Sequence, residues 1–251
     1  MVRLLLIIII FLFGLCVSIK PVAAQKASNV LQLTPQYGAY MPFGNLSERF
    51  GFSQSFGFSG DYVWGGKLGL GLEGQYHFGN KVKENNLVNS LLSSGFMVAD
   101  DGDLVPVGFE QRGMSLMTWL SKNFPFSPKS PNSGFLVKVG IGYTLHKISY
   151  NVDRNAVPQF SPQYRTGYDR LSGGIVFSQF IGLMKIEQQR FANLYLGIEL
   201  QEGLTSNLRP WDLATNTALD ASRFDVRIGL KFGWIIPVWT GASTEDDLYY
   251  Y

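Results

Sequence analysis

The sequence predicts an all-β protein, a transmembrane antiparallel up-and-down β-barrel of eight strands, with ten strands as the alternative. Only 16% of the 251 residues are charged, whereas an ordinary soluble domain carries about 25%. After residue 25, no apolar run reaches the ~20 residues that a spanning helix needs. Large apolar residues instead alternate with small or polar ones at a period of two, which is typical of strands with one apolar face. A closed barrel satisfies every backbone hydrogen bond in lipid.

The N-terminus has the order of an export signal. A short positive segment, Met1–Arg3, precedes an apolar run, Leu4–Val17, and the small residues Val22–Ala24 offer a cleavage site. We expect residues 1–24 to be removed. Cys16 is the only cysteine and lies in this segment, so the mature chain is expected to have no disulfide and no thiolate ligand for a metal.

The strand pattern is clearest in residues 223–236, where seven large apolar residues share one face. Residues 67–78, 135–146 and 194–201 show the same separation of bulk from charge. A lipid-facing strand of a barrel is expected to alternate in this way. Four weaker segments complete the expected set of eight, and the last of them shows no clear choice of face: residues 31–43, 52–59, 113–120 and 171–185.

An even number of strands places both ends of a barrel on the periplasmic side, with short turns there and longer loops outside. The long polar connections at residues 79–108, 149–169 and 205–221 are therefore expected outside. The barrel should occupy residues 25–239, in the outer membrane and in contact with its lipid. Residues 240–251 would form a periplasmic tail.

The interior of an eight-stranded barrel is just wide enough for side chains to fill. Charges of both signs lie on the polar faces of the expected strands, and we expect them to pair and plug the lumen, because a buried unpaired charge is costly. The alternative is a narrow channel or a small-ligand site. The expected lumen charges are Lys67, Glu73, Lys138, Glu199, Arg223, Asp225, Arg227 and Lys231.

A lipid-modifying enzyme is a second alternative, since such an enzyme needs a nucleophile beside a base. The chain offers only His77 and His146 as histidines, and in an extended strand His146 and Ser149 point to opposite faces. Two distant histidines give no recognisable metal-ligand spacing. We therefore predict no enzymatic activity, no catalytic residue, no cofactor and no metal. The balanced charge of the mature chain does not favour nucleic acid.

Tryptophans near the ends of expected strands are typical of the membrane boundaries. Trp64, Trp119, Trp234 and Trp239 are assigned this role.

Four stretches carry a family resemblance: YGAYMPFGNLSERFG, GLEGQYHFGNKVKENNL, PNSGFLVKVGIGYTLHKI followed by GYDRLSGG, and WIIPVW near the end. They resemble the small outer-membrane β-barrels of Bacteroidota, over nearly the whole mature chain. Within that group the chain looks like the PorG and PorT kind of barrel, which is attached to the type IX secretion and gliding machinery. The resemblance implies an accessory barrel that holds periplasmic machinery and does no chemistry.

The tail extends beyond the last strand, because Trp239 could already supply the terminal aromatic residue of the barrel. Three acids would keep this segment soluble, and its large amphipathic groups are of the type that anchors interfaces. A frayed terminus with tyrosines on the headgroups is the alternative. We expect a structural subunit that docks a periplasmic or outer-membrane protein through the tail. The expected partner-binding residues are Glu245, Asp246, Asp247, Leu248, Tyr249, Tyr250 and Tyr251.

Overall fold

The computed structural model describes residues 29–84, 87, 96–99, 101–127, 132–152, 157, 165–186, 192–213, 215–218 and 222–240. The expected export signal (1–24) and all but the first residue of the expected tail (241–251) lie outside the described residues, so both stay predictions.

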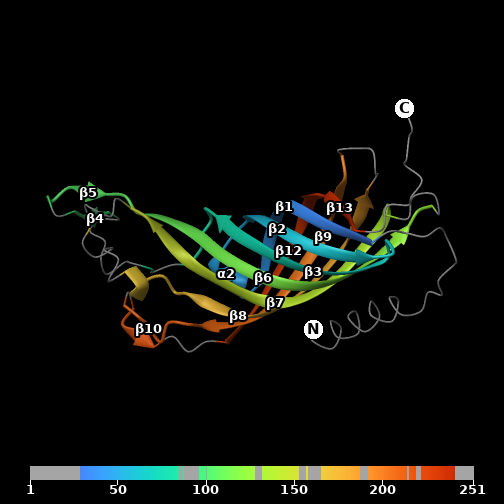
Figure 1. Cartoon of the computed structure of the whole chain (residues 1–251). Helices are drawn as coiled ribbons and strands as arrows, with labels where there is room; N and C mark the ends of the chain where they lie inside the picture. The colour runs from blue at the N-terminus through green and yellow to red at the C-terminus, as the bar shows by residue number, and fades with distance from the viewer. Residues whose placement is uncertain are drawn as a thin grey trace.

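Long antiparallel strands dominate the molecule (Figure 1). The wall consists of β1 (Asn29–Gly44), β2 (Ser53–Trp64), β3 (Leu68–Gly79), β6 (Gly108–Pro125), β7 (Gly134–Asn151), β8 (Ser172–Lys185), β9 (Leu194–Asn207), β12 (Ser222–Trp234) and β13 (Ile236–Thr240). Short elements lie between them: α2 (Leu46–Arg49), β4 (Met97–Val98), β5 (Leu104–Val105), η3 (Arg165–Gly167), β10 (Trp211–Asp212) and β11 (Thr217–Ala218).

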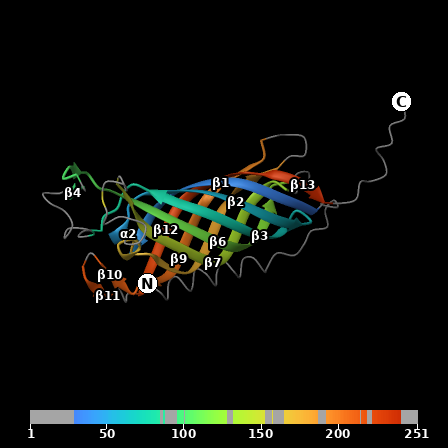
Figure 2. The same cartoon turned by 60° about the vertical axis from the view of Figure 1, so that its left-hand side comes forward.

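The wall closes between its first and last strands. Each long strand pairs antiparallel with the next along the chain, and β1 then pairs with both β12 and β13. Figure 2 shows β1 and β13 side by side. Since β13 continues β12 after the single residue Ile235, the described residues form a barrel of eight wall strands. This confirms the predicted fold class and eight strands rather than ten.

The outer face of the wall is apolar along most of its length. On β6, β8 and β12 the outward side chains Leu116, Ile175 and Leu230 are each 60% or more exposed. An exposed apolar belt of this extent is stable in contact with hydrocarbon and not in water. No helix among the described residues is long and apolar enough to cross a membrane.

The two ends of the barrel differ. One end, called the turn end here, carries the N-terminal end of β1, the C-terminal end of β13 and the connections β2–β3, β6–β7 and β8–β9. The tight β2–β3 connection uses Gly65 and Gly66 at φ +53° and +66°, which glycine adopts without steric cost. The other end, called the loop end, carries α2, η3 and the hairpins β4–β5 and β10–β11. Figure 1 shows β4, β5 and β10 at this end.

The structure shows which face of β8 points outward, a question that its sequence pattern left open. Ile175 and Ile181 point outward, whereas Ser178 and Phe180 are buried inside the barrel. Apolar residues occupy both faces of this strand, because Val176, Phe180 and Met184 contribute to an apolar cluster in the lumen. The simple rule of polar inside and apolar outside therefore does not apply to β8.

Candidate functional site

Ion pairs cross the middle of the lumen. Lys231 Nζ on β12 lies 2.6 Å from Glu73 Oε1 on β3 and 3.2 Å from Glu199 Oε2 on β9. Strands β12 and β3 are separated in the wall by β1 and β2, so the Lys231–Glu73 pair spans the interior. All three side chains are buried. Because one ammonium cannot neutralise two carboxylates, the buried carboxylates need further hydrogen-bond donors.

Neighbouring side chains supply those donors. Tyr40 donates its hydroxyl to Glu199 Oε2 at 2.7 Å, and Ser178 donates to Glu199 Oε1 at 2.9 Å. Gln201 also donates to Glu199 Oε1, at 3.1 Å. Gln75 Nε2 donates to Glu73 Oε1 at 2.5 Å. Charge-assisted hydrogen bonds such as these offset much of the cost of burying the carboxylates.

A second pair crosses the lumen closer to the turn end. Lys138 Nζ on β7 lies 3.0 Å from Asp61 Oδ1 on β2, and β6 and β3 lie between these two strands. Lys138 Nζ is also 5.5 Å from the ring centroid of Trp119, and Lys231 Nζ is 5.1 Å from the same ring. The indole thus lies within cation–π range of two ammonium groups.

An apolar cluster lies beside these pairs in the lumen. Trp119 in this cluster is fully buried, and Gly140 on β7 leaves room for its indole, since a Cβ there would lie 2.7 Å from ring atoms. Trp239 packs against the cluster from β13. This turn-end plug consists of Met117, Trp119, Leu136, Val176, Phe180, Met184, Ile186, Tyr195 and Ile235.

Toward the loop end the lumen is basic. His146 Nε2 lies 3.2 Å from Arg49 Nη1 and 3.6 Å from Asp225 Oδ2. Thr205 donates to the same Asp225 oxygen at 2.7 Å. Arg227 is buried nearby and its Nη1 has no hydrogen-bond partner among the described residues.

A chain of ion pairs then joins the loops above the barrel. Glu84 accepts from Arg49 Nε at 3.1 Å and from Arg170 Nη1 at 2.8 Å. Arg170 Nη2 lies 2.6 Å from Asp212 Oδ2, and Arg209 makes two 3.1 Å contacts to Asp169. These residues come from all four connections at the loop end, so the network ties the loops to one another.

The electrostatics of this network favour the charged forms of Arg170 and Arg209. Burial disfavours the Arg170 guanidinium, but the carboxylates of Glu84 and Asp212 outweigh that effect and raise the pKa of Arg170. The hydrogen bonds to Asp169 raise the pKa of Arg209 above its ordinary value, although burial opposes them.

Apolar side chains cover the mouth next to this network. Leu46 at the start of α2 and Phe50 directly after its end are buried, together with Ile148 near the end of β7. The full cluster consists of Leu46, Phe50, Leu87, Met97, Ile148, Tyr150 and Val157. The barrel is therefore capped by its own loops.

The structure places the eight expected lumen charges unequally. Glu73, Lys138, Glu199, Asp225, Arg227 and Lys231 are buried in the interior. Arg223 is half-buried and donates to Asn207 Oδ1 at 2.8 Å and Ser172 Oγ at 3.1 Å. The prediction for Lys67 is wrong: Lys67 is exposed in the β2–β3 turn, because β3 begins one residue later and the turn carries the side chain out of the wall.

Two of the four tryptophan assignments are also wrong. Trp64 and Trp234 are exposed near the turn end, as expected for interfacial aromatics. Trp119 lies inside the barrel and Trp239 packs against the same interior cluster. The alternation of β6 gives the reason, because Trp119 shares a face with Met117 and Ser121, not with Leu116 and Leu120.

Sequence reasoning missed the charged residues that complete these networks. Asp61 lies on the inward face of β2 with Ser59, which donates to it at 2.8 Å, and extending the period-two analysis to residue 64 would have found it. Arg49, Glu84 and Arg170 lie in connections that carry no periodicity. Their pairing follows from the packing of loops that are distant in sequence.

One pair resembles part of a catalytic arrangement. His77 Nε2 lies 3.1 Å from Ser115 Oγ on the neighbouring strand. Both side chains are buried in the lumen, and His77 Nδ1 has no hydrogen-bond partner among the described residues. Among the residues that the structure describes, no third group orients this histidine as a catalytic base would require. Across the described part of the chain, no group of three potential metal ligands occurs.

No protein-family model matches the sequence, and no curated protein matches it. Among solved structures, the chain is similar to Ail, the attachment invasion locus protein of Yersinia pestis, with 8% identity over 83% of this chain and 99% of that chain and a TM-score of 0.40. It is also similar to Neisserial surface protein A, with 13% identity over 84% and 98% and a TM-score of 0.36. The N-terminal β-barrel domain of Pseudomonas aeruginosa OprF gives 11% identity over 84% and 99%, with a TM-score of 0.34. At these values, none of them bears on the function of this chain.

Proposed function

We propose that this chain is a non-enzymatic outer-membrane β-barrel that acts as a docking subunit for a partner protein. The observation that carries the proposal is the occupied interior: Lys231–Glu73 and Lys138–Asp61 cross the lumen between strands that are not neighbours, and loops cover the mouth. Because these paired side chains fill the lumen, they leave little space for a solute to bind or to pass through. The work of the protein then falls to its ends and its outer face.

The orientation is part of the proposal. A barrel with an even number of strands has both chain ends on one side, and in the outer membrane that side is the periplasm. The turn end then faces the periplasm, where the proposed partner binds the tail residues Glu245, Asp246, Asp247, Leu248, Tyr249, Tyr250 and Tyr251. The resemblance of the sequence to PorG- and PorT-like barrels supports secretion machinery as the class of that partner.

A comparison of three chains tests the docking role: the full-length protein, a truncation after Thr240, and a full-length variant with Tyr249, Tyr250 and Tyr251 changed to Ser. Each is purified gently in detergent and its co-purifying proteins are identified. We expect one partner complex with the full-length chain, its loss from the truncation, and a weakened complex with the serine variant, which keeps the length and the acids.

The migration of unheated samples on a gel checks that all three barrels are folded. The same proteins recovered with all three chains, or none with any, would refute docking through the tail.

The loop end offers a second surface for a protein contact. The β4–β5 hairpin projects beyond the barrel (Figures 1 and 2), and Val98 and Leu104 on it are exposed. Exposed apolar groups gathered on a projecting element are typical of interaction sites. Changing Val98 and Leu104 to Ser in the same experiment separates the two ends: a partner that binds the tail should be retained by this variant.

A further inference from the structure

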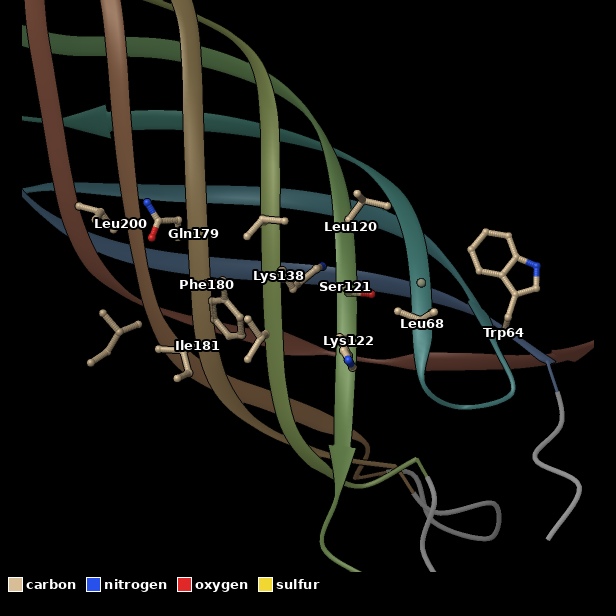
Figure 3. A pocket seen from close by; sticks show the side chains of 14 residues that line it. Trp64, Leu68, Leu120, Ser121, Lys122, Lys138, Gln179, Phe180, Ile181 and Leu200 are labelled. Atoms are coloured by element: carbon tan, nitrogen blue, oxygen red, sulfur yellow. The ribbon is translucent and has the colours of Figure 1, made fainter. Parts of the chain in front are cut away.

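An apolar groove crosses the outer wall near the turn end. It has a volume of about 430 Å³ and runs over β3, β6, β7, β8 and β9. Figure 3 shows these strands side by side, with Trp64 and Leu68 at one end of the groove and Gln179 and Leu200 at the other.

Differences in side-chain size create the groove. Its floor includes Val137 and Val139 on β7, which are short and half-buried. Leu120 on β6 and Ile181 on β8 stand on either side and are more than half exposed. The register places Val139 opposite Leu120, and Val137 opposite Ile181. A valine row between taller flanking residues leaves a channel that suits a flexible hydrocarbon chain.

A positive charge lies at the turn-end side of this channel. Lys122 lines the groove, three residues before the end of β6, and is in register with Leu68 on β3 and Val137 on β7. Its Nζ is 5.2 Å from the ring centroid of Phe124, which is closer still to the end of the strand. A lysine on the lipid-facing side is costly at the middle of the membrane and tolerated near the interface. The ammonium group is therefore expected at headgroup depth, and the exposed Trp64 is of the type that marks the same depth.

We propose that the groove is a binding site for one anionic glycerophospholipid of the leaflet at the turn end. The headgroup phosphate contacts Lys122, and an acyl chain lies along the valine floor toward Gln179. An ammonium and a phosphodiester attract each other more strongly where the surroundings exclude water. The assignment of this leaflet to the periplasmic side rests on the orientation given under the proposed function. The binding site itself does not depend on that orientation.

Native mass spectrometry of the purified barrel in detergent tests the site, with phosphatidylglycerol and phosphatidylcholine of identical acyl chains offered at equal concentration. We expect one retained lipid, with the anionic lipid preferred by about fivefold, as a single lysine near an anionic lipid contributes roughly 1 kcal/mol. Lys122→Gln should abolish that preference. Val139→Trp, which fills the floor from the outer face, should remove the retained lipid of either kind.

Lys185→Gln is the matched control, because Lys185 is exposed at the turn end of β8 and does not line the groove. This variant should bind as the unchanged protein does. An equal loss of preference in the Lys122 and Lys185 variants, a retained lipid in the Val139→Trp variant, or no retained lipid in the unchanged protein would overturn the proposal. Lipid binding is measured without any partner protein, so a failure here is separable from a failure of the docking role.

Discussion

Lys231 Nζ lies 2.6 Å from Glu73 Oε1, although the two residues are 158 positions apart in the sequence. Their strands, β12 and β3, face each other across the lumen. The same ammonium also lies 3.2 Å from Glu199 Oε2. Removing it would leave two buried carboxylates close together with no cation between them. This relationship makes the lumen an element of stability, and it leads to the first prediction.

Lys231→Met should lower the free energy of unfolding by about 3–5 kcal/mol, the usual cost of leaving a buried charge without its partner. Urea unfolding in lipid vesicles, followed by tryptophan fluorescence, measures the loss. A triple variant with Lys231→Met, Glu73→Gln and Glu199→Gln removes all three charges and should recover most of the stability. If the single variant were as stable as the unchanged protein, the pair would not hold the barrel together.

Trp119→Ala should cost about 3–5 kcal/mol of unfolding free energy, because the indole is fully buried and fills the turn-end plug. Trp234→Ala is the control: Trp234 is about half exposed on the outer face, and its truncation should cost markedly less. The same urea titration compares the two. Equal losses would contradict the placement of Trp119 inside the lumen.

Arg170→Met should loosen the loops at the loop end while leaving the barrel wall folded. Glu84 and Asp212 would each lose a charged partner, and one such hydrogen bond contributes about 1.5–3 kcal/mol. Limited proteolysis of the cap should accelerate by roughly tenfold or more. Arg112→Met breaks an ion pair with Glu110 that is more exposed to solvent, and it should leave the cleavage rate unchanged.

The purified protein should give no steady single-channel conductance in a planar lipid bilayer, since ion pairs and the turn-end plug occupy the lumen. A double variant with Tyr40→Ala and Trp119→Ala removes two fully buried rings from the interior and serves as the comparison in which current is more readily obtained. Reproducible ohmic steps from the unchanged protein would instead favour the narrow-channel alternative.

Glu202→Leu should raise the free energy of unfolding by about 1 kcal/mol, because Glu202 shares the outward face of β9 with Leu204 but is itself buried, opposite Phe177 and Val226. Its Oε1 is buried without a hydrogen-bond partner among the described residues. Glu199→Leu, three residues earlier on the inward face, should have the opposite sign, since it removes the acceptor of Tyr40 and Ser178. Vesicle unfolding of both variants provides the measurement, and a loss of stability in the Glu202 variant would mean that this carboxyl has a stabilising partner.

Much of the wall could be predicted from the sequence because the direction of a side chain in a strand depends only on its position in the alternation. In β12, the sequence alone predicts that Ile228 and Leu230 point outward and that Arg227 and Lys231 point inward. The prediction was wrong where the strand alternation ended, and where large apolar residues occupy both faces of a strand. Lys67 lies one residue before its strand, and β6 carries a tryptophan on its inward face.

The sequence by itself determined the fold class, the faces of its clearest strands and the burial of six of the eight expected lumen charges. Only the tertiary structure decided which of those charges meet: Lys231 with Glu73 and Glu199, Lys138 with Asp61, and Arg49 and Arg170 with Glu84. Alternation is a local property of each strand, so it can be read from neighbouring residues. A contact across the lumen depends on how the strands are staggered when the wall closes, and a contact between loops depends on their packing over the mouth.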